Sequence, residues 1–372
     1  MLLIKSQRDM LLSPLLSVSG IVEKRHTLPI LSNVLLEKEE DRLTFLATDI
    51  EIQITTVTNG TIGENDGAVT VSAKKLQDIL RLLPENSEVS LSLDEKRLLI
   101  RTEKSRFSLQ TLPASDFPRM AISEDSSKKI TVTQKQFRHL LGQTQFAMAT
   151  QDVRYYLNGL LLLIDGKYLR AVATDGHRLA YASMALNVED ESNLPHQEFI
   201  LPRKTVLELS RQLDDSDELL HIELASNQIR FQFKQIDLVS KLIDGKFPDY
   251  ERVIPASLKS TIVLNRTDLY QSMVRAAILT NEKFRGIRLL LSNGILKIIA
   301  ANTEQEEAQE EIEVEFHGDP LDVGFNVGYL LDVLNNTTAE MIEWGFNDAN
   351  SSSLITIPDN DHFKYVVMPM RI

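Results

Sequence analysis

The sequence contains no cysteine, and other features that mark particular protein classes are also absent. Without cysteine there is no disulfide framework, thiolate zinc site or cysteine nucleophile, which fits a reducing compartment. The seven histidines are scattered and none lies two to four residues from another, so no histidine metal site is predicted. No apolar run approaches the roughly 18 residues of a membrane span. We therefore expect no metal, no cofactor and no membrane association.

One N-terminal stretch resembles a secretion signal. Lys5 and Arg8 precede the uncharged residues 10–22, MLLSPLLSVSGIV. Asp9 interrupts its start, serine and proline dilute its apolar character, and the stretch belongs to an internal repeat. With 372 residues, 43% hydrophobic and 25% charged, we expect a cytoplasmic globular protein of two or three domains.

A short apolar strand followed by a capped helix occurs three times, at nearly equal steps along the chain. The copies are LLIKSQRDMLL, ITVTQKQFRHLL and TIVLNRTDLYQSM, with Ser6, Thr133 and Asn265 as the expected capping residues. Each copy continues with apolar strands that end in LTFLATD, LRAVATD or LKIIAAN. A second helix and period-two strands complete each copy.

This order predicts an α+β fold of three tandem domains with one topology, each built from two helices and antiparallel sheets. The sequences SDFPRM and GKFPDY suggest boundaries that divide the chain into domains 1–125, 126–251 and 252–372. Pro14 should kink or shorten the first helix. The six expected helices are 6–22, 72–82, 133–149, 201–213, 265–279 and 326–336.

The net charge is −13, yet the six expected helices together carry +6. One interpretation is that the helices share a face and present a weakly positive surface, including Lys74 and Lys75, to a polyanion. The alternative is a chance imbalance, because lysine and arginine are good helix formers. The count alone favours chance, and the repeated structure is the reason to keep the first interpretation.

Two regions of opposite charge suggest contact between copies of the chain. A strand ribbon in the first unit is basic, whereas TEQEEAQEE in the third unit is acidic. A solvated charge run is the ordinary explanation. A head-to-tail contact would instead pair the two regions around an apolar centre, and would generate a ring or a filament. The candidate interface residues are Arg97, Arg101, Lys104, Arg106, Phe107, Leu109, Ile278, Leu279, Glu304, Glu306 and Glu307.

No motif for phosphate binding, nucleotide binding, hydrolysis or metal binding occurs. The best catalytic candidates are Asp175 and His177 in ATDGHRLA, an acid and an imidazole two residues apart. Gly176 between them favours a structural turn with a satisfied aspartate. A hydrolase or lyase, and a protein-binding scaffold without a nucleic-acid role, remain as alternatives.

Five stretches in order closely resemble the bacterial sliding clamps, the β subunits of DNA polymerase III, and the resemblance covers all three units. They are QDVRYYLNG, ATDGHRLA, FPDYERV, NEKFRG and the terminal YVVMPMRI. The resemblance implies a non-enzymatic homodimer that closes head to tail into a six-domain ring around double-stranded DNA. It further implies that the ring tethers the replicative DNA polymerase, the clamp loader and other proteins with short clamp-binding motifs.

The resemblance also implies site residues. The peptide-binding pocket, between the second and third domains, would use Leu157, Thr174, Gly176, His177, Arg178, Leu179, Pro248, Arg252, Val253, Val366, Val367, Met368, Pro369 and Met370. The DNA-facing side chains would be Arg25, Gln151, Tyr155, Tyr156 and Arg203. The apolar C-terminal tail has a second interpretation as a last core strand, and we expect a mixture, with Val366 and Val367 partly structural. The loop 191–196 looks lengthened relative to the family.

Overall fold

The computed structural model describes residues 1–22, 28–121, 128–186 and 194–371, and the element order repeats three times. The first copy contains β1 (Leu2–Gln7), α1 (Arg8–Ser19), β2 (Asn33–Glu39), β3 (Arg42–Thr48), β4 (Ile52–Asn59), β5 (Thr61–Ile62), β6 (Gly67–Ser72), α2 (Ala73–Leu82), β7 (Glu88–Asp94), β8 (Arg97–Arg101) and β9 (Arg106–Pro113). The second contains β10 (Lys128–Thr133), α3 (Gln134–Gly142), β11 (Gly159–Gly166), β12 (Tyr168–Thr174), β13 (Arg178–Ala185), β14 (Leu194–Pro202), α4 (Arg203–Gln212), β15 (Leu219–Leu224), β16 (Gln228–Phe233) and β17 (Ile236–Lys241). The third contains β18 (Ser260–Asn265), α5 (Arg266–Ala277), β19 (Gly286–Ser292), β20 (Ile295–Ala301), β21 (Glu307–Glu313), β22 (Leu321–Asn326), α6 (Val327–Asn336), β23 (Met341–Phe346), β24 (Ser353–Ile357) and β25 (Asn360–Val367). The predicted repeat of strand, helix, strands, helix, strands is confirmed.

The chain forms two compact units, and each unit contains part of the middle copy. The first unit is Met1–Lys135 with Leu207–Leu242, and the second is Gln136–Val206 with Ile243–Ile372. The first unit contains one sheet in the order β10-β15-β16-β17-β4-β3-β2-β6-β9-β8-β7-β1-β5. The second contains the sheets β14-β11-β12-β13-β25-β24-β23-β18 and β21-β20-β19-β22.

Two strand pairings join the middle copy to its neighbours in the sequence. Within the first unit β17 pairs antiparallel with β4, so that Leu238 lies opposite Ile54. Within the second unit β13 pairs antiparallel with β25, so that Leu179 lies opposite Val366. Because backbone hydrogen bonds cross both junctions, the sheets continue from one copy into the next.

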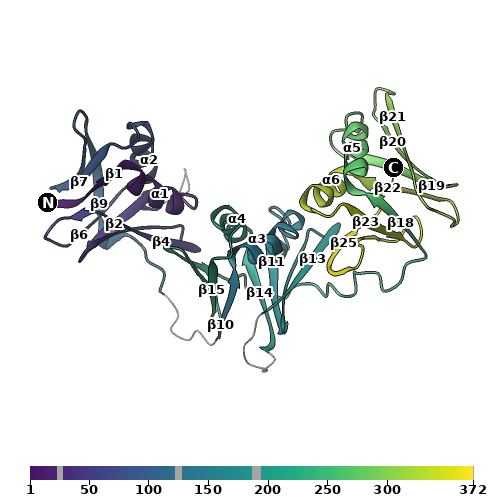
Figure 1. Ribbon diagram of the computed structural model, residues 1–372, viewed down its shortest axis with the longest axis horizontal. Helices are drawn as coiled ribbons and strands as arrows, with labels where there is room; N and C mark the ends of the chain where they lie inside the picture. Colours follow the sequence, from purple (N-terminus) through teal and green to yellow (C-terminus); the bar gives the residue numbers. More distant parts are fainter. Residues whose placement is uncertain (23–27, 122–127, 187–193, 372) are drawn as a thin grey trace. The chain divides into compact units, whose positions relative to one another are not determined.

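Each outer copy places its two helices side by side, α1 with α2 and α5 with α6 (Figure 1). The helices turn leucines at spacings of three and four toward the strands, as the apolar periodicity predicts. In the first unit Leu11, Leu15, Leu76 and Leu80 are fully buried. Each such side chain stabilises the fold by roughly 1.5–3 kcal/mol relative to an exposed one.

The predicted cap at Ser6 is wrong. The helix begins at Arg8, its N-cap is Gln7, and no side chain accepts a hydrogen bond from its first turn. The strand β1 continues through Gln7, which pairs with Glu88, and the Ser6 hydroxyl donates to the Asn59 carbonyl at 3.3 Å. Sheet pairing therefore overrides the local capping signal. The predicted cap at Asn265 is confirmed, because its side chain accepts from the backbone N–H groups of residues 267 and 268.

Pro14 neither shortens α1 nor leaves a carbonyl unsatisfied. The helix continues through it to Ser19. A proline cannot donate to the carbonyl four residues earlier, which belongs to Met10. The Thr58 hydroxyl on β4 donates to that carbonyl at 2.7 Å. A side chain from the sheet thus replaces the missing helical hydrogen bond.

The third expected helix, 133–149, is too long. It ends at Gly142, and a short 3₁₀ turn follows at Gln145–Ala147. The Thr144 hydroxyl donates to the Leu140 carbonyl at 3.0 Å and so occupies a carbonyl of the helix end.

No helix of the described residues has the length and apolar character needed to span a membrane.

Candidate functional site

The turn between β12 and β13, Thr174 to Arg178, is held by its own side chains. The Thr174 hydroxyl accepts from the Gly176 N–H at 3.1 Å and donates to the Arg178 carbonyl at 2.6 Å. The Asp175 carboxylate accepts from the N–H groups of His177 and Arg178 at 2.9 and 3.1 Å. Gly176 has φ +90°, and a Cβ there would lie 2.8 Å from the Arg154 guanidinium. The backbone angle is the reason for glycine here, because the Arg154 guanidinium is the end of a flexible side chain that could move aside.

This geometry makes Asp175 a structural residue. One carboxylate oxygen caps the turn, and the other accepts from Arg178 Nε at 3.1 Å. The His177 side chain is exposed. The predicted turn with a satisfied aspartate is confirmed, and the geometry gives no support to an acid–base pair.

The C-terminal tail lies directly beside this turn. β25 runs antiparallel to β13 and places Val367 opposite Arg178. The Met368 N–H then donates to the His177 carbonyl at 2.9 Å, and the Met370 N–H donates to the Gly324 carbonyl on β22 at 2.8 Å. The tail is thus fixed at both ends by backbone hydrogen bonds.

The candidate pocket residues fall into two sets according to burial. Leu157, Leu179, Val366 and Val367 are at most 1% exposed, and the first three share one core cluster with Phe247 and Tyr250, against which Val253 packs. The surface set has four exposed members: His177, Pro248, Arg252 and Met368, the last of which is 43% exposed. Its other members, Pro369 and Met370, are half-buried. The first set thus belongs to the core, and the second set is accessible to solvent.

Arg178 is the most buried charged group of this region, with 9% of its side chain exposed. It donates to the Phe146 carbonyl at 2.7 Å and to the Asp332 carboxylate on α6, and it lies 4.5 Å from the centre of the Tyr329 ring. Burial alone would lower the pKa of Arg178, but Tyr365 and the two carboxylates raise it above its ordinary value. Tyr365 is itself buried, which raises its pKa, and its hydroxyl donates to the Tyr329 carbonyl at 2.9 Å.

Asp332 was missed by the sequence analysis, although one feature of its helix points to it. It is the only charged residue in α6, VGYLLDVLNN, and lies among apolar neighbours. Such a carboxylate in an apolar helix needs a partner. Arg154 was also missed, although it lies within QDVRYYLNG.

Arg154 links the loop before β11 to the turn. Its guanidinium donates to the Asp152 carboxylate through Nε at 3.0 Å and Nη2 at 2.9 Å, and Nη2 also lies 3.3 Å from the Asp175 carbonyl. The hydrogen bonds from Arg154 lower the pKa of Asp152 to about 2. Asn158 closes the loop by bonding the N–H and the carbonyl of Asp152.

The candidate DNA-facing residues have different surroundings. In the second unit Gln151 is exposed, Tyr155 is 58% exposed, and Tyr156 is half-buried with its ring edge toward Tyr155. Arg203 is also half-buried and donates to the Met148 carbonyl at 3.3 Å. In the first unit Lys74 and Lys75 are exposed on α2. Arg25 and residues 191–193 of the loop 191–196 lie outside the described residues.

The candidate interface residues occupy two open sheet edges, one in each unit. Among the described residues, the segment 106–110 of β9 pairs only with β8, and β21 pairs only with β20. Phe107 and Leu109 are half-buried on β9. Ile278 is 75% exposed just after α5, and Leu279 is half-buried. The charged members Arg97, Arg101, Lys104, Arg106, Glu304, Glu306 and Glu307 are all exposed.

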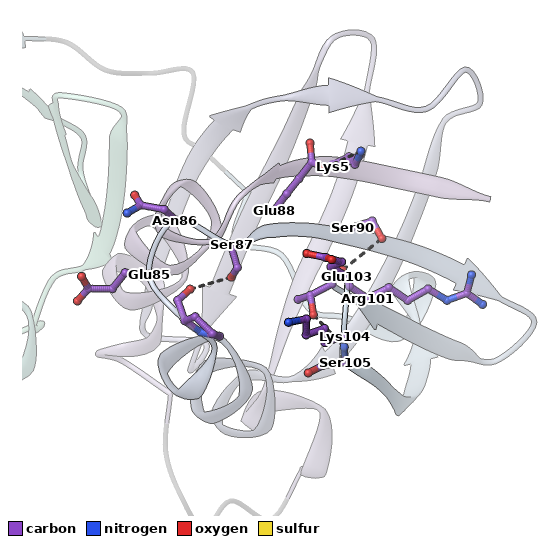
Figure 2. A pocket seen from close by; sticks show the side chains of 12 residues that line it. Lys5, Glu85, Asn86, Ser87, Glu88, Ser90, Arg101, Glu103, Lys104 and Ser105 are labelled. Carbon is purple, nitrogen blue, oxygen red and sulfur yellow. Dashed lines mark hydrogen bonds and ion pairs between the residues drawn. The ribbon is translucent and has the colours of Figure 1, made fainter.

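A cleft of about 740 Å³, lined mostly by polar and charged residues, lies at the turn between β8 and β9 in the first unit (Figure 2). Lys5 and Glu88 form an ion pair of 2.7 Å there, and the Ser90 hydroxyl lies 3.5 Å from the Arg101 carbonyl. The Arg101 side chain points away from the cleft (Figure 2). Of the candidate interface residues, Arg101 and Lys104 line this cleft.

In the described parts of the chain, no three acidic or histidine side chains converge in a way that could hold a metal ion.

Three copies of a two-helix, antiparallel-sheet unit, joined by continuous sheets, define an α+β protein of the DNA clamp class. Family models of the DNA polymerase III beta subunit match its N-terminal domain at residues 2–121, its central domain at 131–249 and its C-terminal domain at 251–371. The chain belongs to the DNA polymerase III beta subunit family, the beta sliding clamps. It is therefore a processivity factor of DNA replication and not an enzyme.

Relatives and solved structures agree with this assignment. The chain is 47% identical to the beta sliding clamp of Pseudomonas aeruginosa, over 98% of this chain and 99% of the relative. It is 45% identical to that of Escherichia coli, with the same coverage. A crystal structure of the Pseudomonas aeruginosa clamp with ligand matches with a TM-score of 0.94 and 46% identity, covering 100% of both chains. Another structure of the clamp from that organism contains bound griselimycin.

Proposed function

We propose that two copies of this chain close head to tail into a ring of six domains that encircles double-stranded DNA. The domains would be 1–125, 126–251 and 252–372, and the matched family ranges support these boundaries. The ring slides without sequence specificity and tethers the replicative polymerase, the clamp loader and other proteins with short clamp-binding motifs. It works in the cytoplasm.

The proposal for the ring rests on the two open edges. Arg106 lies on the edge strand β9, Lys104 in the turn before it, and Arg101 at the end of the adjacent strand β8. Glu307 begins the edge strand β21, and Glu304 and Glu306 lie just before it. Two open strands with opposite charge can pair antiparallel, and Phe107 and Ile278 would supply an apolar centre. Because the two patches differ, the contact is heterologous and closes with two copies.

The proposal for DNA rests on topology and weak charge. A net charge of −13 disfavours tight binding to DNA. A closed ring needs no tight binding, and a few exposed residues such as Lys74 and Lys75 provide sequence-independent phosphate contacts. Gln151, Tyr155, Tyr156, Arg203 and Arg25 are the other side chains proposed to face DNA.

The single observation that carries the partner-binding function is the register of β13 with β25. It brings the turn at Gly176 and His177 beside Met368, which is exposed and adaptable. Pro248, Arg252 and Val253 would complete a surface for an extended or helical peptide. The buried Leu157, Leu179, Val366 and Val367 would form its floor, with Thr174, Arg178, Pro369 and Met370 at its edges.

The ring is tested by its dependence on DNA topology. The protein is loaded onto nicked circular plasmid by a clamp loader with ATP, separated from free protein by gel filtration, and divided into two portions. One portion is cut once with a restriction enzyme. We expect the protein to stay on the circle and to leave the linear plasmid. Equal retention on both would contradict encirclement, and would fit a scaffold that binds DNA directly.

A further inference from the structure

Arg178 lies at the junction of three elements of the second unit. Its Nε donates to Asp175 in its own turn, its Nη2 donates to the carbonyl of Phe146, and its Nη1 donates to Asp332 on α6. The Tyr329 ring covers the guanidinium at 4.5 Å. All three guanidinium nitrogens are thus engaged by the protein itself.

We propose that Arg178 is a positioning residue of the peptide-binding site, which rests on the function proposed above. It holds the turn 174–178 against α6, and it need not touch the bound peptide. Arg252 provides the contrast, because its side chain is 86% exposed and, within the described parts of the chain, pairs only with Asp249 in its own segment. Arg252 is therefore the arginine that is available to a partner.

The backbone extends this effect to the tail. Arg178 lies opposite Val367 in the β13–β25 register, and the residue before it, His177, accepts the hydrogen bond of the Met368 N–H. A shift of the turn would move the His177 carbonyl and release Met368. The Arg178 guanidinium thereby holds the backbone at His177 and at Met368, whose side chains are both exposed.

Stability alone does not account for a buried cation at this place. Removing the Arg178 guanidinium and most of the Asp175 carboxylate from water is costly, although Asp332 keeps 46% of its side chain exposed. Well-packed apolar groups of similar volume are often as stable or more so. What an apolar group cannot supply is direction, because the planar guanidinium donates along fixed axes. The cluster therefore specifies the geometry of the turn.

The test compares Arg178→Lys, Asp332→Asn and the double variant in the full-length protein. The matched control is Asp165→Asn, which removes a carboxylate from Arg170 at the opposite end of the β11–β12 hairpin. Binding of a fluorescein-labelled synthetic peptide, copied from the clamp-binding segment of a replicative polymerase, is measured by anisotropy. Amide exchange of residues 176 and 368 is measured without peptide.

We expect Asp332→Asn to raise the Kd about tenfold and Arg178→Lys at least as much, and the double variant to raise it no further than Arg178→Lys, because that change already removes the bond to Asp332. Amide exchange at Gly176 and Met368 should accelerate in both variants, and the control should match the unchanged protein. If Arg178→Lys does not fold, Asp332→Asn and Tyr329→Leu carry the same test.

Two results would overturn the positioning role. If Asp332→Asn binds peptide normally while Arg178→Lys does not, Arg178 contacts the peptide directly. If amide exchange at Met368 is unchanged in both variants, the turn does not depend on the cluster. Failure of the unchanged protein to bind any such peptide would instead refute the proposed partner-binding function, and the exchange data would still decide the role of Arg178.

Discussion

The C-terminal tail offers the sharpest separation of structural from functional residues. We compare the double variant Val366→Ala/Val367→Ala with Met368→Ala/Met370→Ala. The valines lie within β25 between β13 and β24 and are at most 1% exposed. Met368 is 43% exposed and Met370 is half-buried, and both hold their places through backbone N–H groups that alanine retains.

The magnitudes follow from burial. Each valine change removes two buried methyl groups worth about 0.8 kcal/mol apiece and leaves a small cavity, so about 2 kcal/mol per site is expected. Adjacent strand residues point to opposite faces, so the two costs should nearly add to roughly 4 kcal/mol. For folding units of 150–250 residues this lowers the thermal midpoint by roughly 10 °C. The methionine variant should cost under about 1 kcal/mol per site because its side chains are only partly buried.

Thermal melting, sedimentation and peptide binding by fluorescence anisotropy are measured on the same preparations, to separate structural from functional residues of the tail. We expect the methionine variant to melt within a few degrees of the unchanged protein, to remain dimeric, and to lose most of its affinity for a polymerase-derived peptide. The valine variant should melt early. Undiminished peptide affinity in the methionine variant would refute the assignment of Met368 and Met370 to the binding surface.

Three further predictions concern the interface, a helix cap and a loop. Ile278→Asp should give a folded monomer in sedimentation, because Ile278 is 75% exposed in one chain and a carboxylate buried in the dimer would lack a partner; an unchanged dimer would move the interface elsewhere. Asn265→Ala should lower the stability of the third copy by about 1 kcal/mol, since two N–H groups lose their acceptor, and Asn265→Asp is the conservative control for the melting curves. The Asp152 carboxyl should titrate near pH 2 in an NMR titration. Because its pKa in the folded protein lies below the ordinary 3.8, its stabilisation of the loop is present at neutral pH and is lost as the pH falls through about 2. A midpoint near 3.8 would show that the pair with Arg154 does not persist in solution.

The repeated architecture could be predicted because it depends on local patterns. Apolar residues at spacings of three and four located all six helices, and Asn265 marked the start of one of them. The failures occur where distant segments intervene. Ser6 lost its capping role because β1 pairs with β7 through Gln7, and Pro14 was tolerated because Thr58, far along the chain, satisfies the Met10 carbonyl.

The candidate site shows the same division. Gly176 and Asp175 predict a turn from their own chemistry, and the turn is present. The partners of Arg178 could not be predicted, because Phe146 and Asp332 come from segments far apart in the sequence. Burial likewise separates Val366 from Met368 although the two are near neighbours in an apolar tail. Only the strand register of β25 determines where that tail leaves the sheet.

The pairing of β17 with β4 and of β13 with β25 means that the compact units of the structure do not coincide with the repeats of the sequence. The first compact unit takes the first copy and the smaller part of the middle copy, which includes Leu207–Leu242. The second takes the third copy and the larger part of the middle copy, which includes Gln136–Val206. A middle copy excised on its own would expose two long strand edges, and such edges invite pairing with other chains. The three copies therefore no longer behave as interchangeable modules, and insertions or fusions are better tolerated at the ends of hairpins than at the junctions between repeats.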